Sequence, residues 1–165
     1  MTTDHTTTDG KPTTKGRKPI PRYQGALNRL IRTLLRTPLV SRGIGSRLLT
    51  IEVVGRKTGK PYVVPVSYTR HEGRLLVGTP GIKWARNLRT GTPVHIRLRG
   101  RRRLADVVVH SGEDEVMRLY DVVARDNHAN ASFSGIGIEA DGSPNRADLR
   151  QAWRSGAVVL ELTPH

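Results

Sequence analysis

The first clear hydrophobic pattern in the chain has the period of a helix. Between residues 22 and 36, leucine and isoleucine recur at helical spacing, with arginines between them. Pro38 follows and ends the pattern, because proline interrupts a helix. These residues predict an amphipathic helix over 22–36. It either packs on the rest of the fold, or rests on a membrane surface or covers a hydrophobic substrate.

After this helix the hydrophobic pattern changes to short runs rich in β-branched residues. Few-residue polar or glycine-containing connections join most of these runs, which is typical of antiparallel hairpins. Pro65 lies inside the second run and lacks a backbone donor, so a bulge or a sheet edge is expected there. The predicted strands are 48–54, 61–69, 74–79, 93–98, 104–110 and 157–162.

Helices are predicted between and after these strands. A short helix follows the glycine at position 81, and a longer one follows Ser111, with Asp114 in a loose capping box. Ser143 and Pro144 open another helix, which ends near Trp153. Residues 100–103 predict a basic turn, and residues 126–142 predict an irregular segment. The fold class expected is mainly β, a small antiparallel barrel or sandwich of about six strands with three or four flanking helices.

Length and composition predict a single domain. Residues 1–20 have almost no apolar side chains and predict a disordered tail, which leaves residues 21–165 as the folded domain. No apolar run approaches the roughly 20 residues of a membrane span. The chain begins without the apolar block of a secretory signal, so we expect a cytoplasmic protein with peripheral membrane contact through 22–36 as an option. The lack of cysteine excludes disulfides and a cysteine nucleophile.

The chain is strongly basic, with a formal net charge of +14, of which +12 falls after residue 20. A field of this size attracts anionic ligands, anionic lipid surfaces or nucleic acid. Arginines are dense between residues 97 and 103, which suggests a non-enzymatic binder of nucleic acid or membrane as one alternative. Only 4% of the residues are aromatic, so stacking platforms are scarce and specific nucleic-acid recognition is not expected.

Two short segments carry candidate chemistry. Residues 55–61 read GRKTGKP, a tight turn with three cations, a hydroxyl and flexible glycines that suits a phosphate or carboxylate group. An ordinary solvated hairpin tip would have the same composition. Residues 79–81 end a strand and are followed by Trp84, Arg86 and Asn87. These residues suit a flat ring and anionic oxygens, although Trp84 could equally anchor the helix in the core.

Motifs for other chemistries are absent from the sequence. There is no Gly-x-Ser-x-Gly, no HExxH and no Rossmann or Walker glycine pattern. The six histidines are scattered without ligand spacing, so no metal site is expected. An anion-binding turn on an antiparallel barrel without general acid–base residues points to a bound cofactor that carries the chemistry.

The segment LLTIEVVGRKTGKPYVVPVSY, followed by WARNLRTG, resembles the deazaflavin (F420)-dependent nitroreductase and quinone reductase family. That family belongs to the flavin-binding split β-barrel superfamily, and the resemblance spans roughly residues 46–110. It implies a split barrel and reduced F420 as the hydride donor. The implied activity is reduction of a small hydrophobic acceptor such as a quinone, an enone or a nitroaromatic. An FMN-binding split-barrel oxidoreductase is the alternative, and a homodimer is expected by analogy.

The resemblance also implies roles for individual residues. The basic turn would hold the phosphate and acidic tail of the coenzyme, while residues of the second and third strands would lie beside its ring. Trp84 and Asn87 would shape the pocket, and Arg86 is added from its charge alone, as a binder of anionic oxygens. The implied cofactor-binding residues are Arg56, Lys57, Thr58, Lys60, Pro65, Val66, Ser67, Thr79, Gly81, Trp84, Arg86 and Asn87.

The chain departs from the family pattern on the substrate side. The family places a tyrosine in the second strand and further tyrosines before the last strand. Here Ser67 takes the strand position, and the later stretch offers His128, Asn130 and Phe133 instead. The loop before Trp84 is also shorter, which changes the wall of the pocket. The candidate catalytic residues, as donors of a proton to the acceptor, are Ser67, Tyr68 and His128.

Overall fold

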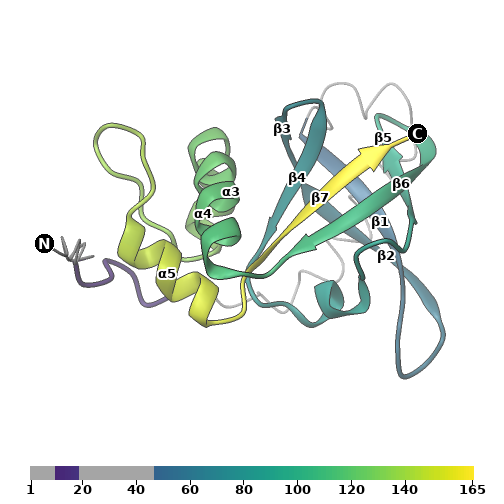
Figure 1. The fold of residues 1–165 in the computed structure, drawn as a ribbon, viewed down its shortest axis with the longest axis horizontal. Coiled ribbons are helices and arrows are strands. Elements are labelled where there is room, and N and C mark those ends of the chain that lie inside the picture. The colour runs from purple at the N-terminus through teal and green to yellow at the C-terminus, as the bar shows by residue number, and fades with distance from the viewer. Residues whose placement is uncertain (1–9, 19–46) are drawn as a thin grey trace, which may run out of the picture.

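The computed structural model describes residues 10–18 and 47–165. Its barrel strands and its α-helices lie at opposite ends of the molecule (Figure 1). Antiparallel strands curl into a barrel at one end, and the helices gather at the other. The helix predicted over 22–36 lies outside the described residues. Among the helices that are described, none is long and apolar enough to cross a membrane.

The strands confirm the predicted split antiparallel β-barrel with flanking helices. Every pairing is antiparallel, and the sheet order is β2-β1-β5-β6-β7-β4-β3. The described residues form seven strands rather than about six, because the second predicted run divides at Tyr68. Their bounds are β1 Leu48–Val54, β2 Pro61–Ser67, β3 Thr69–His71, β4 Arg74–Thr79, β5 Val94–Leu98, β6 Arg101–His110 and β7 Val158–Pro164.

Side-chain alternation along the strands builds two hydrophobic cores. Leu49, Ile51 and Val53 of β1 point into the barrel and are at most 1% exposed. In β4 and β7, side chains at alternate positions pack into different cores. Val77 and Leu160 pack inside the barrel, whereas their neighbours Leu76 and Val159 pack under the helices. These two strands therefore join the barrel to the helical layer.

The barrel is split beside β2. Pro65 pairs with Thr50 in an unbroken register, so of the two predicted alternatives the sheet edge, and not the bulge, is confirmed. Within the described part of the chain, β2 pairs only with β1, and its other edge has no strand partner. A proline is tolerated at this place because its missing N–H removes no ladder bond from an edge.

Within residues 10–18 and 47–165, three α-helices and one 3-10 helix accompany the strands. They are η1 Lys83–Asn87, α3 Glu113–Asp126, α4 His128–Phe133 and α5 Arg146–Arg154. The predicted capping box at Ser111 is wrong, because Gly112 precedes α3 and no side chain caps it. The helix predicted from Ser143 begins instead after Asn145, whose side chain accepts a bond from the Asp148 N–H.

Two further sequence predictions differ from the structure. The segment 126–142 was expected to be irregular, but it contains α4, whose cap is the Asn127 side chain. The basic turn predicted over 100–103 is shorter, because β6 already begins at Arg101. Arg99 and Gly100 make this turn with positive φ angles of 50° and 79°.

Residues 10–18, part of the predicted disordered tail, lie against the helical end in ordered contacts. The carboxylate of the fully buried Asp148 accepts hydrogen bonds from the backbone N–H groups of Thr13, Thr14 and Gly137 at 2.7, 3.1 and 2.9 Å. The Thr13 hydroxyl also donates to this carboxylate. Further along, the Lys18 N–H donates to the Phe133 carbonyl at 3.2 Å, at the end of α4.

Replacing Asp148 with alanine should lower the free energy of unfolding by about 3 kcal/mol, because the donors that meet at its buried carboxylate lose their common acceptor. Urea unfolding followed by far-UV circular dichroism measures this change. Asp106→Ala is the matched control, since that carboxylate is 56% exposed and pairs only with His165 among the described residues. The control should stay within about 0.5 kcal/mol of wild type. Equal effects of the two changes would contradict a role for Asp148 as a buried anchor.

Replacing Gly78 with alanine should also destabilise the protein, by about 2 kcal/mol. A β-carbon at this position would lie 2.7 Å from Cζ of Tyr120, whose ring is fully buried and cannot move away. Gly10→Ala is the control, because a β-carbon there meets nothing within 4 Å. Thermal unfolding of both variants tests the expectation, and an unchanged melting temperature for Gly78→Ala would refute it.

Candidate functional site

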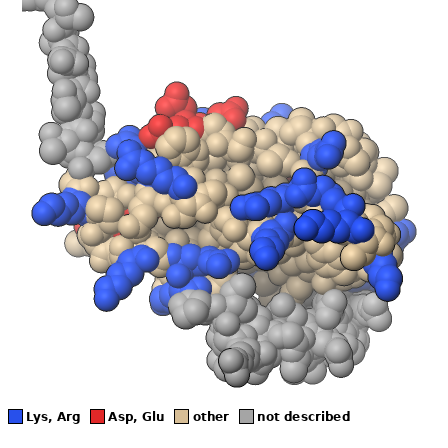
Figure 2. Space-filling view, turned by 90° about the horizontal axis from the view of Figure 1, so that it is seen from below, with Lys and Arg blue, Asp and Glu red and all other residues tan. Residues whose placement is uncertain are grey.

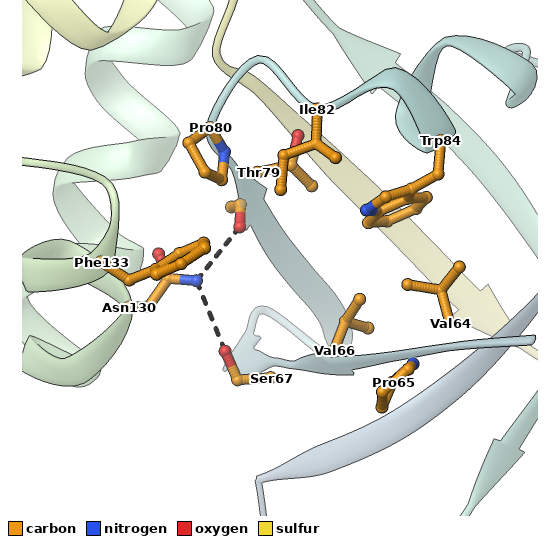
Figure 3. A pocket seen from close by; sticks show the side chains of 11 residues that line it. Val64, Pro65, Val66, Ser67, Thr79, Pro80, Ile82, Trp84, Asn130 and Phe133 are labelled. Atoms are coloured by element: carbon orange, nitrogen blue, oxygen red, sulfur yellow. Dashed lines mark hydrogen bonds between the residues drawn. The ribbon is translucent and has the colours of Figure 1, made fainter. Parts of the chain in front are cut away.

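An open cavity of about 260 Å³ lies where the barrel is split (Figure 3). Strand β2 forms one wall, and the end of β4 with the loop that leads to η1 forms the wall opposite. Helix α4 closes the side toward the helical layer. The lining residues are Val64, Pro65, Val66, Ser67, Gly78, Thr79, Pro80, Ile82, Trp84, Asn130 and Phe133.

The walls of the cavity are mostly apolar. Val64 and Val66 reach it from β2, Trp84 from η1 and Phe133 from α4, and all four side chains are half-buried. Aromatic and branched aliphatic surfaces of this kind suit a flat ring, and ligand sites commonly combine such walls with few polar groups. The cavity therefore has the character of a binding site for a planar, largely apolar group.

The polar side chains of the cavity meet around Asn130. Its Nδ2 donates to the Gly78 carbonyl at 3.1 Å and to Ser67 Oγ at 3.4 Å. Its Oδ1 accepts from the hydroxyl of the buried Tyr120 at 3.1 Å. Thr79 also lines the cavity, but its hydroxyl donates to the Val158 carbonyl.

The basic turn predicted between the first two strands is confirmed as a hairpin. The Gly55 N–H donates to the Lys60 carbonyl at 3.0 Å, and the Gly59 N–H donates to the Gly55 carbonyl at 2.8 Å. The side chains of Arg56, Lys57 and Lys60 are exposed. Within residues 10–18 and 47–165, no carboxylate forms a salt bridge with these three cations.

One arginine on the outside of the barrel is differently placed, because a carboxylate neutralises it. Arg102 of β6 binds the carboxylate of Glu52 through two bonds of 2.8 and 2.9 Å, and this pairing lowers the pKa of Glu52. Lys and Arg side chains spread over both ends of the face shown in Figure 2, while acidic side chains gather at one edge. The turn thus has unneutralised cations within a generally positive surface, which favours an anionic ligand.

Asn87 holds the turn in place. Its Oδ1 accepts from Nε of Arg56 at 3.2 Å, and its Nδ2 donates to the hydroxyl of Tyr62 at 2.7 Å. Asn87 is the last residue of η1, and Trp84 near the start of the same helix lines the cavity. The 3-10 helix therefore connects the cavity to the basic turn.

The structure brings most of the predicted cofactor-binding residues into two neighbouring groups. Residues 65–67, Thr79 and Trp84 line the cavity, and residues 56–58 with Lys60 form the turn. Asn87 contacts the turn rather than the cavity, and the exposed Arg86 is not among the lining residues.

Three other predicted site residues lie away from the cavity. Gly81 packs against the chain before β7, and a β-carbon on it would lie 2.4 Å from the Ser155 carbonyl oxygen. Tyr68 is 2% exposed and belongs to the barrel core. His128 is exposed at the start of α4 and faces a separate hollow beside residues 14–18. Of the candidate catalytic residues, only Ser67 lines the cavity.

The sequence indicated Asn130 and Phe133 only as replacements for tyrosines on the substrate side, and it indicated no site role for Tyr120. Asn130 and Phe133 stand where the family pattern has tyrosines, and this position before the last strand was the available signal. Tyr120 shares a helical apolar stripe with Val116, Leu119 and Val123, a pattern that by itself indicates a core position. Nothing in its spacing indicated that its hydroxyl reaches Asn130.

Comparisons with solved structures find distant similarity. A pyridoxamine 5'-phosphate oxidase-related, FMN-binding protein from Nostoc punctiforme is 16% identical, covering 88% of this chain and 81% of its own, with a TM-score of 0.48. An F420-H2 dependent reductase, FDR-A, is 14% identical, covering 70% of this chain and 94% of its own, with a TM-score of 0.41. A comparison with curated proteins finds no significant match.

A family model gives the decisive match. The model for F420H(2)-dependent quinone reductase matches residues 32–135, well over half of the chain. The matched range contains the basic turn, β2, η1 and α4, and so covers both parts of the site. The chain belongs to the F420H(2)-dependent quinone reductase family.

Proposed function

We propose that this protein is an F420H2-dependent reductase that acts on a quinone or a related flat, conjugated acceptor. One observation carries the proposal: an apolar cavity and a turn of unneutralised cations are connected by the same two elements, β2 and η1. Deazaflavin coenzymes combine a flat ring with a negatively charged tail, so one molecule of this kind matches both parts.

The residues present fit the coenzyme that the family uses. The turn offers Arg56, Lys57 and Lys60 as cations, together with the Thr58 hydroxyl, for phosphate and carboxylate oxygens. The anchoring of Arg56 Nε to Asn87 fixes one of these cations near the end of η1. Pro65 and Val66 of β2 supply flat apolar surface for a ring.

The coenzyme, when bound, supplies a hydride, and the work of this chain's own residues is to bind, orient and exclude water. Trp84 and Phe133 cover opposite ends of the cavity and would shield a bound ring from solvent. Ser67 is the candidate to donate a hydrogen bond or a proton to the acceptor, because Tyr68 and His128 lie elsewhere. The family description favours quinones, and enones and nitroaromatics are further candidates of the same shape.

Changing both Arg56 and Lys57 to alanine should weaken F420 binding roughly 10- to 100-fold, because two charge-assisted contacts are lost. Quenching of tryptophan fluorescence during an F420 titration measures the affinity. Arg101→Ala with Arg103→Ala is the matched control, since it removes the same charge from exposed positions of β6.

The control pair should change the affinity by less than about three-fold, as expected for general electrostatic attraction. Parallel titrations with FMN test the alternative cofactor, and tighter binding of FMN would replace the coenzyme in the proposal. If neither compound bound, the proposed function would fail, and a basic-surface binder would become the leading interpretation.

A further inference from the structure

The cavity contains a short chain of hydrogen bonds whose direction can be assigned atom by atom. Asn130 is its centre, at the junction of α4, β2 and β4 (Figure 3). The Gly78 carbonyl oxygen can only accept, so the atom facing it at 3.1 Å must be the Asn130 amide nitrogen. The Asn130 Oδ1 then faces Tyr120, and its distance of 3.1 Å from the Tyr120 hydroxyl makes Tyr120 the donor. The orientation of the amide is therefore fixed by both partners.

Tyr120 is a permanent donor in this chain. The residue is fully buried, and burial raises the pKa of its hydroxyl far above the ordinary range, so the proton stays on the oxygen. Because that proton is directed to Asn130, the Ser134 hydroxyl at 2.6 Å must donate to the Tyr120 oxygen. The absence of a side chain at Gly78 lets the Tyr120 ring lie against β4 in this position.

At the other end of the chain, Ser67 Oγ accepts from Asn130 Nδ2 at 3.4 Å, since an amide nitrogen cannot accept. The hydroxyl hydrogen of Ser67 is therefore still available. Among residues 10–18 and 47–165, no acceptor for this hydrogen is found, and Ser67 lines the cavity. Bonds that run in one direction polarise one another, which strengthens the terminal donor.

We infer that the Ser67 hydroxyl is an oriented donor for a carbonyl oxygen at the edge of the flat ring that occupies the cavity. Asn130 is the positioning residue that orients it. The inference rests on the proposed function for the nature of the ring, because a quinone acceptor and a deazaflavin both carry ring carbonyls. The inference goes further than the proposed function because it predicts that the cavity prefers ligands with a ring carbonyl. A hydrocarbon of the same size would leave the Ser67 donor without a partner.

Binding measurements on the full chain can test this without turnover. Trp153→Phe leaves Trp84, in the cavity wall, as the remaining tryptophan and so makes its fluorescence the probe. Titrations use menadione, 2-methylnaphthalene, which lacks the two carbonyls, and F420. The variants are Ser67→Ala, Ser67→Thr, Asn130→Ala and the double change Ser67→Ala with Asn130→Ala, each checked for folding by circular dichroism.

We expect Ser67→Ala to weaken menadione or F420 roughly five-fold and to leave 2-methylnaphthalene unchanged, while Ser67→Thr retains the affinity. Weaker binding of menadione would show that Ser67 donates to a carbonyl of the acceptor. Weaker binding of F420 would show that it donates to a carbonyl of the coenzyme. Asn130→Ala should reduce the same affinity, and the double change should lose no more than Ser67→Ala alone, because Asn130 acts through Ser67.

Several results would overturn the inference. Equal affinities of wild type and Ser67→Ala for both carbonyl compounds would remove the donor role, while normal F420 binding would leave the proposed function intact. Additive losses in the double change would show that Asn130 shapes the cavity independently of Ser67. Failure of all three compounds to quench Trp84 would overturn this inference and the assignment of the cavity together.

Discussion

The position of the cavity depends on the way β4 and β7 divide their side chains between two cores. Alternate residues of these strands, such as Val77 and Leu76, pack on opposite sides, into the barrel and under the helices. This double packing places α4 beside the open edge at β2 and brings Asn130 within reach of Ser67. A barrel closed by its own strands would have no such opening. The site is therefore a consequence of how the helical layer is joined to the barrel.

The strands were largely predictable, because a period of two is a local property of the sequence. The alternation in β1 and β5 and the glycines around the basic turn gave nearly correct bounds. Helix α4 was not predictable in the same way, since its six residues are too few for a hydrophobic stripe. Its start is fixed instead by the side chain of Asn127, which caps it. The start of β6 was also missed, because Arg101 and its neighbours have the composition of a turn but continue a ladder with β5.

The candidate site likewise has one part that the sequence predicts and one part that it does not. Its charged half is local, a run of neighbouring residues in one hairpin, and a motif can reveal it. Its apolar half is assembled from β2, β4, η1 and α4, and the contact between Ser67 and Asn130 spans 63 positions of the chain. Asn87 shows the limit of analogy, because it holds the basic turn through Arg56 and Tyr62 rather than shaping the cavity.

Residues 10–18 contact the helix that forms one wall of the cavity, although they lie far from the cavity residues in the sequence. Asp148 holds Thr13 and Thr14, and the same segment reaches the end of α4 through the bond from Lys18 to Phe133. Phe133 and Asn130 on that helix form the cavity wall. Residues 10–18 are thus connected to the cavity wall through α4, although none of them lines the cavity. The cavity wall is therefore supported in part by a segment that lies more than 110 positions earlier in the chain.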